Sequence, residues 1–277
     1  MSVTDLNQDQ NAISKTEGRK ADDLLPQALI LVGLISLVFA AVPELDLIVT
    51  RLFYDPATGF SFEKSRFLIL FRDTNRVLPW AVIGIVLVFL IPTRLRDLLR
   101  YPLPPHKLLF VLTYFALGPG LSVHLIKMLV GRARPRTVDE FGGTALFTPP
   151  WQITDECMRN CSFISGEAAS AFALLTLVLL VRRDHARVYL ATVGIVAAAF
   201  SFNRVVFGAH FLSDVVMAWS LMFVLAVLLW RPFSRHACQI DAFFGSRSLS
   251  VRARSSGAEV GGKTGVERAC ATRSYPS

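Results

Sequence analysis

Apolar runs of nearly membrane-spanning length recur along this chain of 277 residues and constrain its fold more than any other feature. A helix needs roughly 20 apolar residues to cross a bilayer, with about 17 as the lower end. The composition agrees, because 53% of the residues are hydrophobic and only 18% are charged. We therefore predict an all-α integral membrane protein, a six-transmembrane-helix bundle. The predicted spans are Pro26–Val42, Val77–Pro92, Lys107–Lys127, Phe163–Val181, Val188–Phe207 and Phe211–Trp230.

Lys and Arg residues indicate which side of the membrane each loop faces. The chain has 29 Lys and Arg against 21 Asp and Glu, a formal net charge of +8. The Lys and Arg residues cluster after the second and fourth spans and in the C-terminal tail, as is typical of cytoplasmic segments. We therefore predict a multi-pass protein of the bacterial inner membrane with both termini in the cytoplasm. Because the basic residues lie between apolar spans rather than on one face, we expect no nucleic-acid partner.

The composition divides the chain into three segments. Residues 1–24 are polar and mixed in charge, and we predict a cytoplasmic N-terminal segment. Residues 25–230 contain all the spans and form the predicted six-helix domain. Residues 231–277 are rich in Ser, Gly and Arg and lack a periodic apolar stripe, which predicts a disordered, basic cytoplasmic tail.

The predicted outer loop Met128–Ser162 departs from the charge pattern. It contains Arg132, Arg134, Arg136 and Arg159, although outer loops are usually poor in basic residues. Charged residues kept at such a position indicate a functional site. We therefore expect this loop to bind an anion.

Two polar clusters lie at predicted outer span ends. Lys127 and Arg134 are seven residues apart, which in a continuing helix is two turns and one face. The alternative is that both merely reach the lipid head groups. Ser165, Gly166 and Glu167 open the fourth span, where backbone N–H groups of a helix N-terminus can bind an anion. The alternative is a simple N-cap by Ser165.

A third cluster contains Arg204, His210 and Asp214. His210 and Asp214 are four residues apart, so on a helix they share a face and the carboxylate reaches the imidazole. A carboxylate placed in this way orients the ring and makes its other nitrogen more nucleophilic. The alternative is an interfacial ion pair without chemistry, but three such residues at the mouth of a bundle are costly unless they are used.

In order and spacing, the three clusters resemble the three-part signature of the type 2 phosphatidic acid phosphatase family. The resemblance covers roughly residues 25–230. The matching residues are Lys127, Arg134 and Pro135; Ser165 and Gly166; and Arg204, His210 and Asp214.

This resemblance implies a metal-independent phosphatase that works through a phosphohistidine intermediate and needs no cofactor. His210 would attack phosphorus, and Asp214 would orient His210. Three fixed cations suit the spread charge of a phosphoryl transition state. The residues that would hold the phosphoryl oxygens are Lys127, Arg134, Ser165, Gly166 and Arg204. No His and Cys cluster has zinc-site spacing, so we predict no metal site.

Glu167 departs from the family pattern, which has a His that protonates the leaving oxygen. A carboxyl group can act as the general acid if burial raises its pKa or if the bound phosphate returns a proton to it. Alternatively, the leaving group needs little help, or Glu167 recognises an amine or hydroxyl of the substrate. At the other departure, Asn203 stands where the family has Ser, and both can form hydrogen bonds.

The second motif resembles that of bacterial phosphatases acting on lipid A. We therefore predict that the protein removes a phosphate from lipid A, with the 4′-phosphate favoured, at the periplasmic face. The predicted partners are the lipid substrate and the bilayer. The alternatives are an undecaprenyl diphosphate phosphatase, then a phosphatase of phosphatidic acid or phosphatidylglycerophosphate, and, in a different class, a non-catalytic lipid-binding or transport relative.

Cys157 and Cys161 lie four residues apart in the predicted outer loop. A periplasmic loop would permit a disulfide that braces the second motif. The alternative is two reduced thiols in a helical turn, where this spacing is often too long for a bridge.

Overall fold

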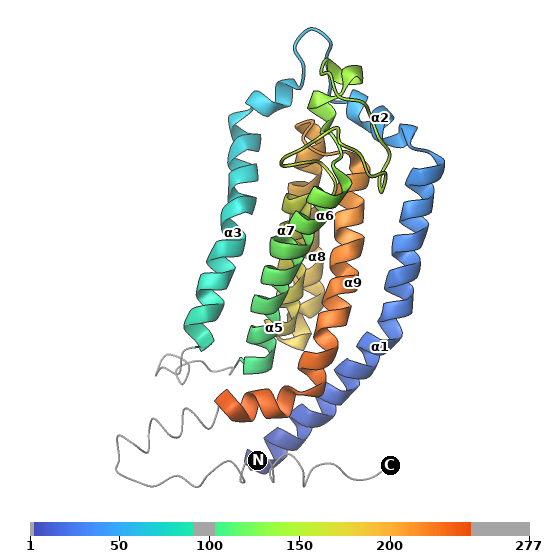
Figure 1. Ribbon diagram of the computed structural model, residues 1–277. Coiled ribbons are helices and arrows are strands. Elements are labelled where there is room, and N and C mark those ends of the chain that lie inside the picture. The colour runs from blue at the N-terminus through green and yellow to red at the C-terminus, as the bar shows by residue number, and fades with distance from the viewer. Residues whose placement is uncertain (1–2, 91–102, 245–277) are drawn as a thin grey trace. The chain divides into compact units, whose positions relative to one another are not determined.

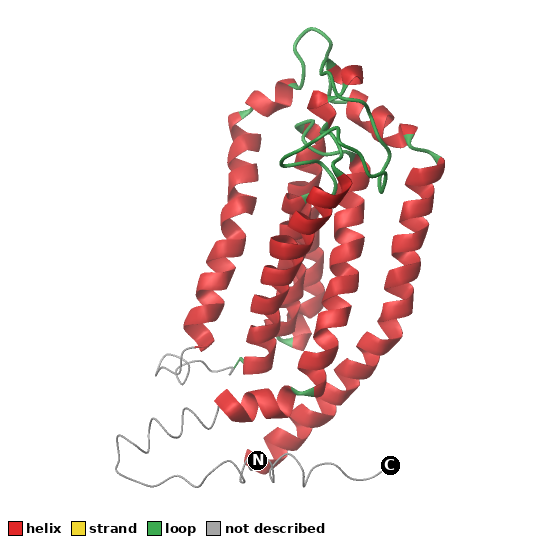
Figure 2. Ribbon diagram, viewed as in Figure 1, coloured by secondary structure: helices red, strands yellow, loops and turns green. Residues whose placement is uncertain are grey.

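The computed structural model describes the backbone of residues 3–90 and 103–244, with side chains from Asp22 onward (Figure 1). Within these ranges the chain forms helices and loops without a β-strand (Figure 2). The α-helices are α1 (Val3–Ala41), α2 (Glu44–Arg51), α3 (Arg66–Leu90), α5 (Pro105–Phe115), α6 (Val123–Val130), α7 (Gly166–Ala173), α8 (Arg183–Val206) and α9 (Leu212–Arg235). The other helices are the π-helix η2 (Ala116–Ser122) and the 3-10 helices η1 (Ser61–Lys64), η3 (Pro135–Thr137), η4 (Asp139–Phe141) and η5 (Leu174–Leu180).

Five helical stretches among the described residues are long and apolar enough to cross a bilayer. They confirm the prediction of an all-α, multi-pass membrane protein. The fourth predicted span corresponds to the shorter apolar helix Gly166–Leu180, so the count of six spans stays a prediction. The five stretches are Asp22–Ala41, Arg66–Leu90, Pro105–Thr137, Arg183–Val206 and Leu212–Arg235.

The chain divides into two compact units. The larger unit consists of Pro26–Ile83 and Thr113–Ala226, and it contains every residue of the site described below. The smaller unit consists of the described parts of Met1–Leu25, Gly84–Leu112 and Val227–Ser277.

Helix α3 begins at Arg66, eleven residues before the predicted start of the second span. The additional turns contain charged side chains, which made them resemble a loop in the sequence. Their charges are paired locally, because Asp73 lies 2.8 Å from the Arg72 guanidinium and 3.7 Å from that of Arg76. The second span therefore begins before its predicted start at Val77.

The third predicted span changes from α-helix to π-helix and back, and its last helix ends at Val130. Pro119, which has no N–H to donate, lies within the π-helix η2 between α5 and α6. Helix α6 ends at Val130, where Gly131 adopts the left-handed conformation with φ of 65°. Arg134 follows in extended conformation. The expectation that Lys127 and Arg134 lie two turns apart on one continuous helix was therefore wrong.

Loops and short helices of the larger unit gather at one end, called the loop end below, which comprises α2 and residues 52–65, 131–165 and 207–211 (Figure 2). An apolar cluster of segments distant in sequence holds it together. The rings of Phe60 and Phe141 lie 5.9 Å apart, and Tyr54 contacts both. Phe211 packs in the same cluster. The loop end is thus a packed structure, and it fixes the segments that flank the helix ends.

In the smaller unit, the helical backbone continues beyond the predicted start of the disordered tail at residue 231. Helix α9 runs to Arg235, and residues 237–244 are again helical. Asp241 accepts hydrogen bonds from the backbone N–H and the imidazole of His106, at 2.9 and 2.8 Å. These contacts join the segment 237–244 to α5, and helical structure thus continues beyond the predicted start of the tail. The remainder of the predicted tail, 245–277, lies outside the described residues.

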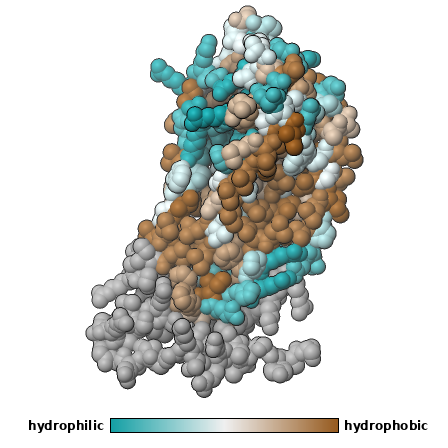
Figure 3. Space-filling model, in the orientation of Figure 1, coloured by the Kyte–Doolittle hydropathy of each residue, from teal (hydrophilic) through white to brown (hydrophobic). Residues whose placement is uncertain are grey.

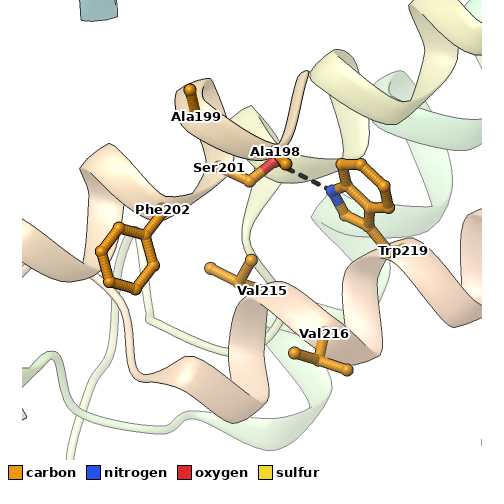
Figure 4. Close-up of a pocket in the computed structure, with 7 residues that line it drawn as sticks. All are labelled: Ala198, Ala199, Ser201, Phe202, Val215, Val216 and Trp219. Carbon is orange, nitrogen blue, oxygen red and sulfur yellow. Dashed lines mark hydrogen bonds between the residues drawn. The ribbon is translucent and has the colours of Figure 1, made fainter. Parts of the chain in front are cut away.

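Hydrophobic side chains cover much of the visible helix surface, and hydrophilic ones gather around the loop end (Figure 3). An apolar groove of about 470 Å³ lies between α8 and α9, and Figure 4 shows its lining. Its polar side chains satisfy each other, because the Trp219 indole N–H donates to the Ser201 hydroxyl at 2.9 Å. A groove of this composition suits the hydrocarbon around a membrane protein rather than polar chemistry.

Candidate active site

A polar pocket of about 260 Å³ lies at the loop end, and all three predicted clusters contribute to its wall. Asp214 and Ser165 are not among the lining residues. The lining residues are Glu63, Arg72, Arg76, Lys127, Arg134, Arg136, Asn160, Gly166, Glu167, Arg204, Phe207 and His210. Segments far apart in the sequence thus converge on a small space dominated by positive charge.

Lys127 and Arg134 are held by backbone carbonyls rather than by carboxylates. The Lys127 ammonium donates to the carbonyls of Cys161 and Ser162. Arg134 donates to the carbonyl and the side-chain oxygen of Asn160, at 2.9 and 2.8 Å. Neutral acceptors fix both cations without neutralising them, so their charge is available to an anion.

Arg204, near the end of α8, faces Glu167 of α7. Its Nε lies 3.1 Å from the Glu167 carboxylate, an ion-pair distance without hydrogen-bond geometry. The Nη1 atom of Arg204 is buried and makes no hydrogen bond. A buried guanidinium N–H without an acceptor is costly, and a phosphoryl oxygen in the pocket would satisfy it.

Glu167 also pairs with an arginine that the sequence analysis did not select. Arg76 of α3 donates from Nε and Nη2 to the same Glu167 oxygen, at 3.0 and 2.8 Å. The carboxylate therefore lies between two guanidinium groups. Both carboxylate oxygens are thus engaged by guanidinium groups, one by Arg76 and the other by Arg204. This geometry does not favour the general-acid role considered for Glu167.

His210 lies in the turn before α9, and Asp214 lies in the first turn of that helix. The expectation that both share one helix face was therefore wrong, although they are neighbours. The distance from His210 Nδ1 to the Asp214 carboxylate is 3.6 Å, which is longer than a hydrogen bond. Burial lowers the pKa of His210 well below its ordinary value of 6.5, and the Lys127 charge adds to this effect. The imidazole is therefore neutral and able to act as a nucleophile at pH 7.

Ser165 is the N-cap of α7. It is fully buried, and its hydroxyl accepts a hydrogen bond from the Ala168 N–H at 3.3 Å. Gly166, in contrast, lines the pocket at the first position of the helix. The simple N-cap alternative therefore describes Ser165, whereas Gly166 adjoins the space where an anion would bind.

A second group of charged and polar side chains lies on the side of His210 that faces away from the pocket, described below as behind His210. Its members are fully buried: Asp46, Arg132, Ser162, Ser213 and Asp214. Arg132 Nη1 donates to Asp214 at 2.7 Å, and its Nη2 donates to Asp46 at 2.8 Å. Arg132 thus bridges a carboxylate of α2 and a carboxylate of α9. We call these five residues the buried charge cluster.

The surroundings of Arg132 explain how its charge is tolerated without water. Its Nε donates to the Thr148 carbonyl at 2.7 Å. Its guanidinium lies 4.3 Å from the ring centre of Phe211 and 5.4 Å from that of Phe147. Cation–π contacts, carboxylates and a carbonyl together replace its hydration. Of the four arginines expected to bind an anion in this loop, Arg132 therefore serves the protein interior.

Asp214 is held at both carboxylate oxygens. Oδ1 accepts from Arg132, and Oδ2 accepts from the Ser162 hydroxyl and from the Phe211 N–H at 2.8 Å. Oδ2 also faces His210. The carboxylate therefore cannot rotate, which gives His210 a fixed charged neighbour.

A disulfide joins Cys157 and Cys161, which answers the question the sequence left open. The bridge encloses Arg159 and Asn160, and Asn160 is the residue that holds Arg134. The disulfide therefore restricts the segment between the first and second motifs.

Three residues that contribute to this region were not predicted from the sequence. Arg72 and Arg76 precede the predicted start of the second span, and the early start of α3 brings them to the pocket. Asp46 was not among the residues selected from the sequence. An acidic residue just after an apolar run was the available signal. Its partner Arg132 lies 86 residues away, so the pair could not be foreseen.

The pocket can bind a phosphoryl group next to a nucleophile. Lys127, Arg134 and Arg204 present positive charge around the His210 ring, and Gly166 opens a helix N-terminus beside them. The described part of the chain holds no group of three or more His, Cys, Asp or Glu residues that could bind a metal ion. That no metal or other cofactor takes part stays a prediction.

Comparisons with known proteins agree on one family. The PAP2 superfamily matches residues 107–238. A lipid A 4′-phosphatase of Rhizobium leguminosarum is 33% identical over 208 residues, which cover 69% of this chain and 89% of that protein. A lipid A 4′-phosphatase of Francisella tularensis subsp. novicida is 30% identical over 204 residues, covering 70% and 91%. No solved structure matches.

Proposed function

Because this chain belongs to the PAP2 superfamily, as the sequence motifs predicted, we propose that it hydrolyses a phosphate ester of a membrane lipid with His210 as nucleophile. The observation that carries the proposal is the convergence of the three motifs on one pocket. His210 lines that pocket together with Lys127, Arg134 and Arg204. A protein that only binds lipid has no need of a buried, oriented imidazole among these cations.

In the proposed reaction, His210 Nε2 attacks phosphorus while the bond from phosphorus to the lipid oxygen breaks. Nδ1 faces Asp214, which leaves Nε2 as the free nitrogen. The leaving oxygen takes a proton from solvent, and the phosphoryl group stays on the ring. Water then attacks the phosphohistidine, gives its proton to solvent and releases inorganic phosphate. His210 returns to its neutral form.

Lys127, Arg134 and Arg204 hold the phosphoryl oxygens in this proposal, and Gly166 adds its backbone N–H. Negative charge is spread over these oxygens in the transition state, so fixed cations around them stabilise it. The unpaired Arg204 Nη1 supports this role. Ser165 contributes indirectly, because its hydroxyl caps the helix that carries Gly166.

Glu167 takes a positioning role in this proposal. It holds Arg76 and Arg204 against the pocket, and Arg76 there stabilises negative charge on the leaving oxygen. The alternative, general acid catalysis by Glu167, would contribute about 10²–10⁴-fold to the rate. These two roles predict different losses for Glu167→Gln, as discussed below.

Lipid A is the proposed substrate, and the 4′-phosphate is the group that we propose is removed from it. Support comes from relatives that carry this name and match over most of their own length. The undecaprenyl diphosphate alternative has no comparable support. Removing a phosphate lowers the negative surface charge of a membrane, which weakens its attraction for cationic peptides.

The same proposal places the protein in the inner membrane with its pocket facing the periplasm and both termini in the cytoplasm. The basic loops after the second and fourth predicted spans support this orientation. The disulfide beside the pocket also supports it, because disulfides persist in the periplasm.

The direct test is to incubate the purified protein in detergent with bisphosphorylated lipid A in the presence of EDTA. Mass spectrometry would identify the phosphate that leaves, and His210→Ala is the blank. We expect loss of the 4′-phosphate only with the native chain. Loss of the 1-phosphate would contradict the regiochemistry. Release only from undecaprenyl diphosphate, tested in parallel, would contradict the substrate, and release from neither would contradict the proposal.

A further inference from the structure

One carboxylate of the buried charge cluster, Asp46 of α2, lies outside all three motifs. We infer that Asp46 is a positioning residue for the phosphatase reaction, which acts through Arg132 to keep Asp214 fixed and charged behind His210. The inference rests on the proposed function. It goes beyond that function, because the proposed function gives Asp46 no role.

Asp46 holds Arg132 in place. Its Oδ2 accepts from Arg132 Nη2 at 2.8 Å, and both side chains are fully buried. Arg132 makes its other carboxylate contact with Asp214 at 2.7 Å. A buried guanidinium that loses one of two carboxylate partners shifts toward the other or leaves its place. The position of Asp214 therefore depends on a carboxylate of another helix.

Asp46 also holds the start of α9. Its Oδ1 accepts from the Ser213 N–H at 2.8 Å, and its Oδ2 accepts from the Ser213 hydroxyl at 2.5 Å. Ser213 is the second residue of α9, so Asp46 performs the role of an N-cap from a different helix. Asp214 follows directly. A single side chain thus fixes both the backbone and the guanidinium on which Asp214 depends.

Asp46 also sets the net charge of the buried charge cluster. Arg132 carries one positive charge, whereas Asp46 and Asp214 together carry two negative charges when ionised. The cluster is then net negative directly behind His210, which becomes cationic when Nε2 bonds to phosphorus. Burial raises the pKa of Asp46, and the charge of Asp214 adds to this, whereas Arg132 opposes both. Without Asp46, Arg132 neutralises Asp214, and the cationic imidazole loses its stabilisation.

The pocket adds its own charges around His210. Lys127 of α6, Arg134 of the following loop and Arg204 of α8 are positive, and Glu167 of α7 is negative. Replacing Asp46 leaves all four of these groups in place. The inference therefore predicts an effect on turnover and on the titration of His210, but not on the capture of phosphate.

The experiment compares Asp46→Asn with Glu44→Gln, which removes an exposed carboxylate from the same helix. Partners that orient a functional imidazole from behind typically contribute about 10- to 100-fold. We expect kcat of Asp46→Asn to fall by this factor with KM unchanged, and Glu44→Gln to match the native chain. The substrates are lipid A and a chromogenic aryl phosphate, so the test does not depend on the lipid being correct.

The imidazole ¹⁵N shifts of His210, identified by their loss in His210→Gln, provide a readout that a merely structural role would not move. We expect the titration midpoint to move to lower pH in Asp46→Asn, because a negative charge has been removed. Asp46→Glu, which keeps the charge, should keep the native midpoint. An unchanged midpoint and kcat in a folded Asp46→Asn would overturn the inference.

Should Asp46→Asn fail to fold, Ser213→Ala carries the test. It removes the hydroxyl that contacts both Asp46 and Arg132, without changing a charge. A lower kcat with unchanged KM would support the inference, and an unchanged kcat would overturn it. If the native chain hydrolyses the aryl phosphate but not lipid A, the proposed substrate is contradicted and the inference on Asp46 still stands.

Discussion

Two groups of charged side chains lie on either side of His210, and they differ in how their charges are satisfied. Behind the ring, Arg132 is fully buried between Asp46 and Asp214, with every contact made by the protein itself. In front of it, Lys127 and Arg134 are held by neutral oxygens. This difference supports two separate roles: the saturated charges hold a geometry, and the unsaturated charges are the proposed ligand-binding groups.

The largest expected effect comes from breaking the buried group at its centre. Arg132→Met leaves two carboxylates buried without their shared cation, and breaking such a pair costs about 3–5 kcal/mol. We expect a large loss of thermal stability in detergent together with loss of turnover. Arg136→Met, in which an arginine at the pocket rim is replaced, is the matched control because its partner Glu63 is exposed to solvent. Equal stability of the two variants would contradict the distinction between the groups.

Removing a cation from the pocket should lower the rate and leave thermal stability unchanged. Arg204→Ala removes a guanidinium with an unpaired N–H, and losing one donor of this kind costs about 10²–10³ in rate. Thermal stability should remain close to that of the native chain, because no buried carboxylate loses its only partner. Glu167 keeps Arg76 in this variant. A loss of stability as large as that of Arg132→Met would show that Arg204 is structural.

A smaller effect is expected at Glu167, which belongs to the pocket but is paired. Glu167→Gln keeps the shape and weakens the hold on Arg76 and Arg204, so we expect a loss of kcat of about tenfold, in line with other positioning partners. Steady-state rates on lipid A measure it. A loss of 10²-fold or more on lipid A, absent with an aryl phosphate that has a good leaving group, would instead indicate general acid catalysis.

The smallest expected effect is on titration. Burial lowers the pKa of His210, so the neutral imidazole persists at pH 7 and is lost only as the pH falls below the ordinary value of 6.5. The ¹⁵N titration of His210 in the native chain should therefore have its midpoint below pH 6.5. A midpoint above that value would show that the negative cluster behind the ring outweighs burial and the Lys127 charge.

Much of this account was predictable from the sequence, because membrane spans and short motifs are local signals. The apolar runs predicted the all-α membrane fold, and the spacings around Lys127, Arg134, Arg204 and His210 selected residues that the structure brings to one pocket. The backbone between motif residues was less predictable. Gly131 ends α6 before Arg134, so equal spacing did not mean an equal helical face.

The contacts that could not be predicted join segments distant in sequence. Arg132 looked like one more loop cation, and only the fold places it between α2 and α9. Arg76 looked like a loop residue because its turn of α3 is charged, and its pairing with Glu167 spans 91 residues. Such pairs depend on how helices are placed side by side, which no local pattern contains.

The central claim is that His210 is the nucleophile between these two groups of charge. The most direct measurement is to mix the purified protein with substrate, quench at alkaline pH because phosphohistidine is acid-labile, and locate the phosphoryl group by peptide mass spectrometry. The account predicts transient phosphorylation at His210, present in native protein and absent in His210→Ala. Turnover without phosphorylation of this residue, or turnover that survives His210→Ala, would contradict it.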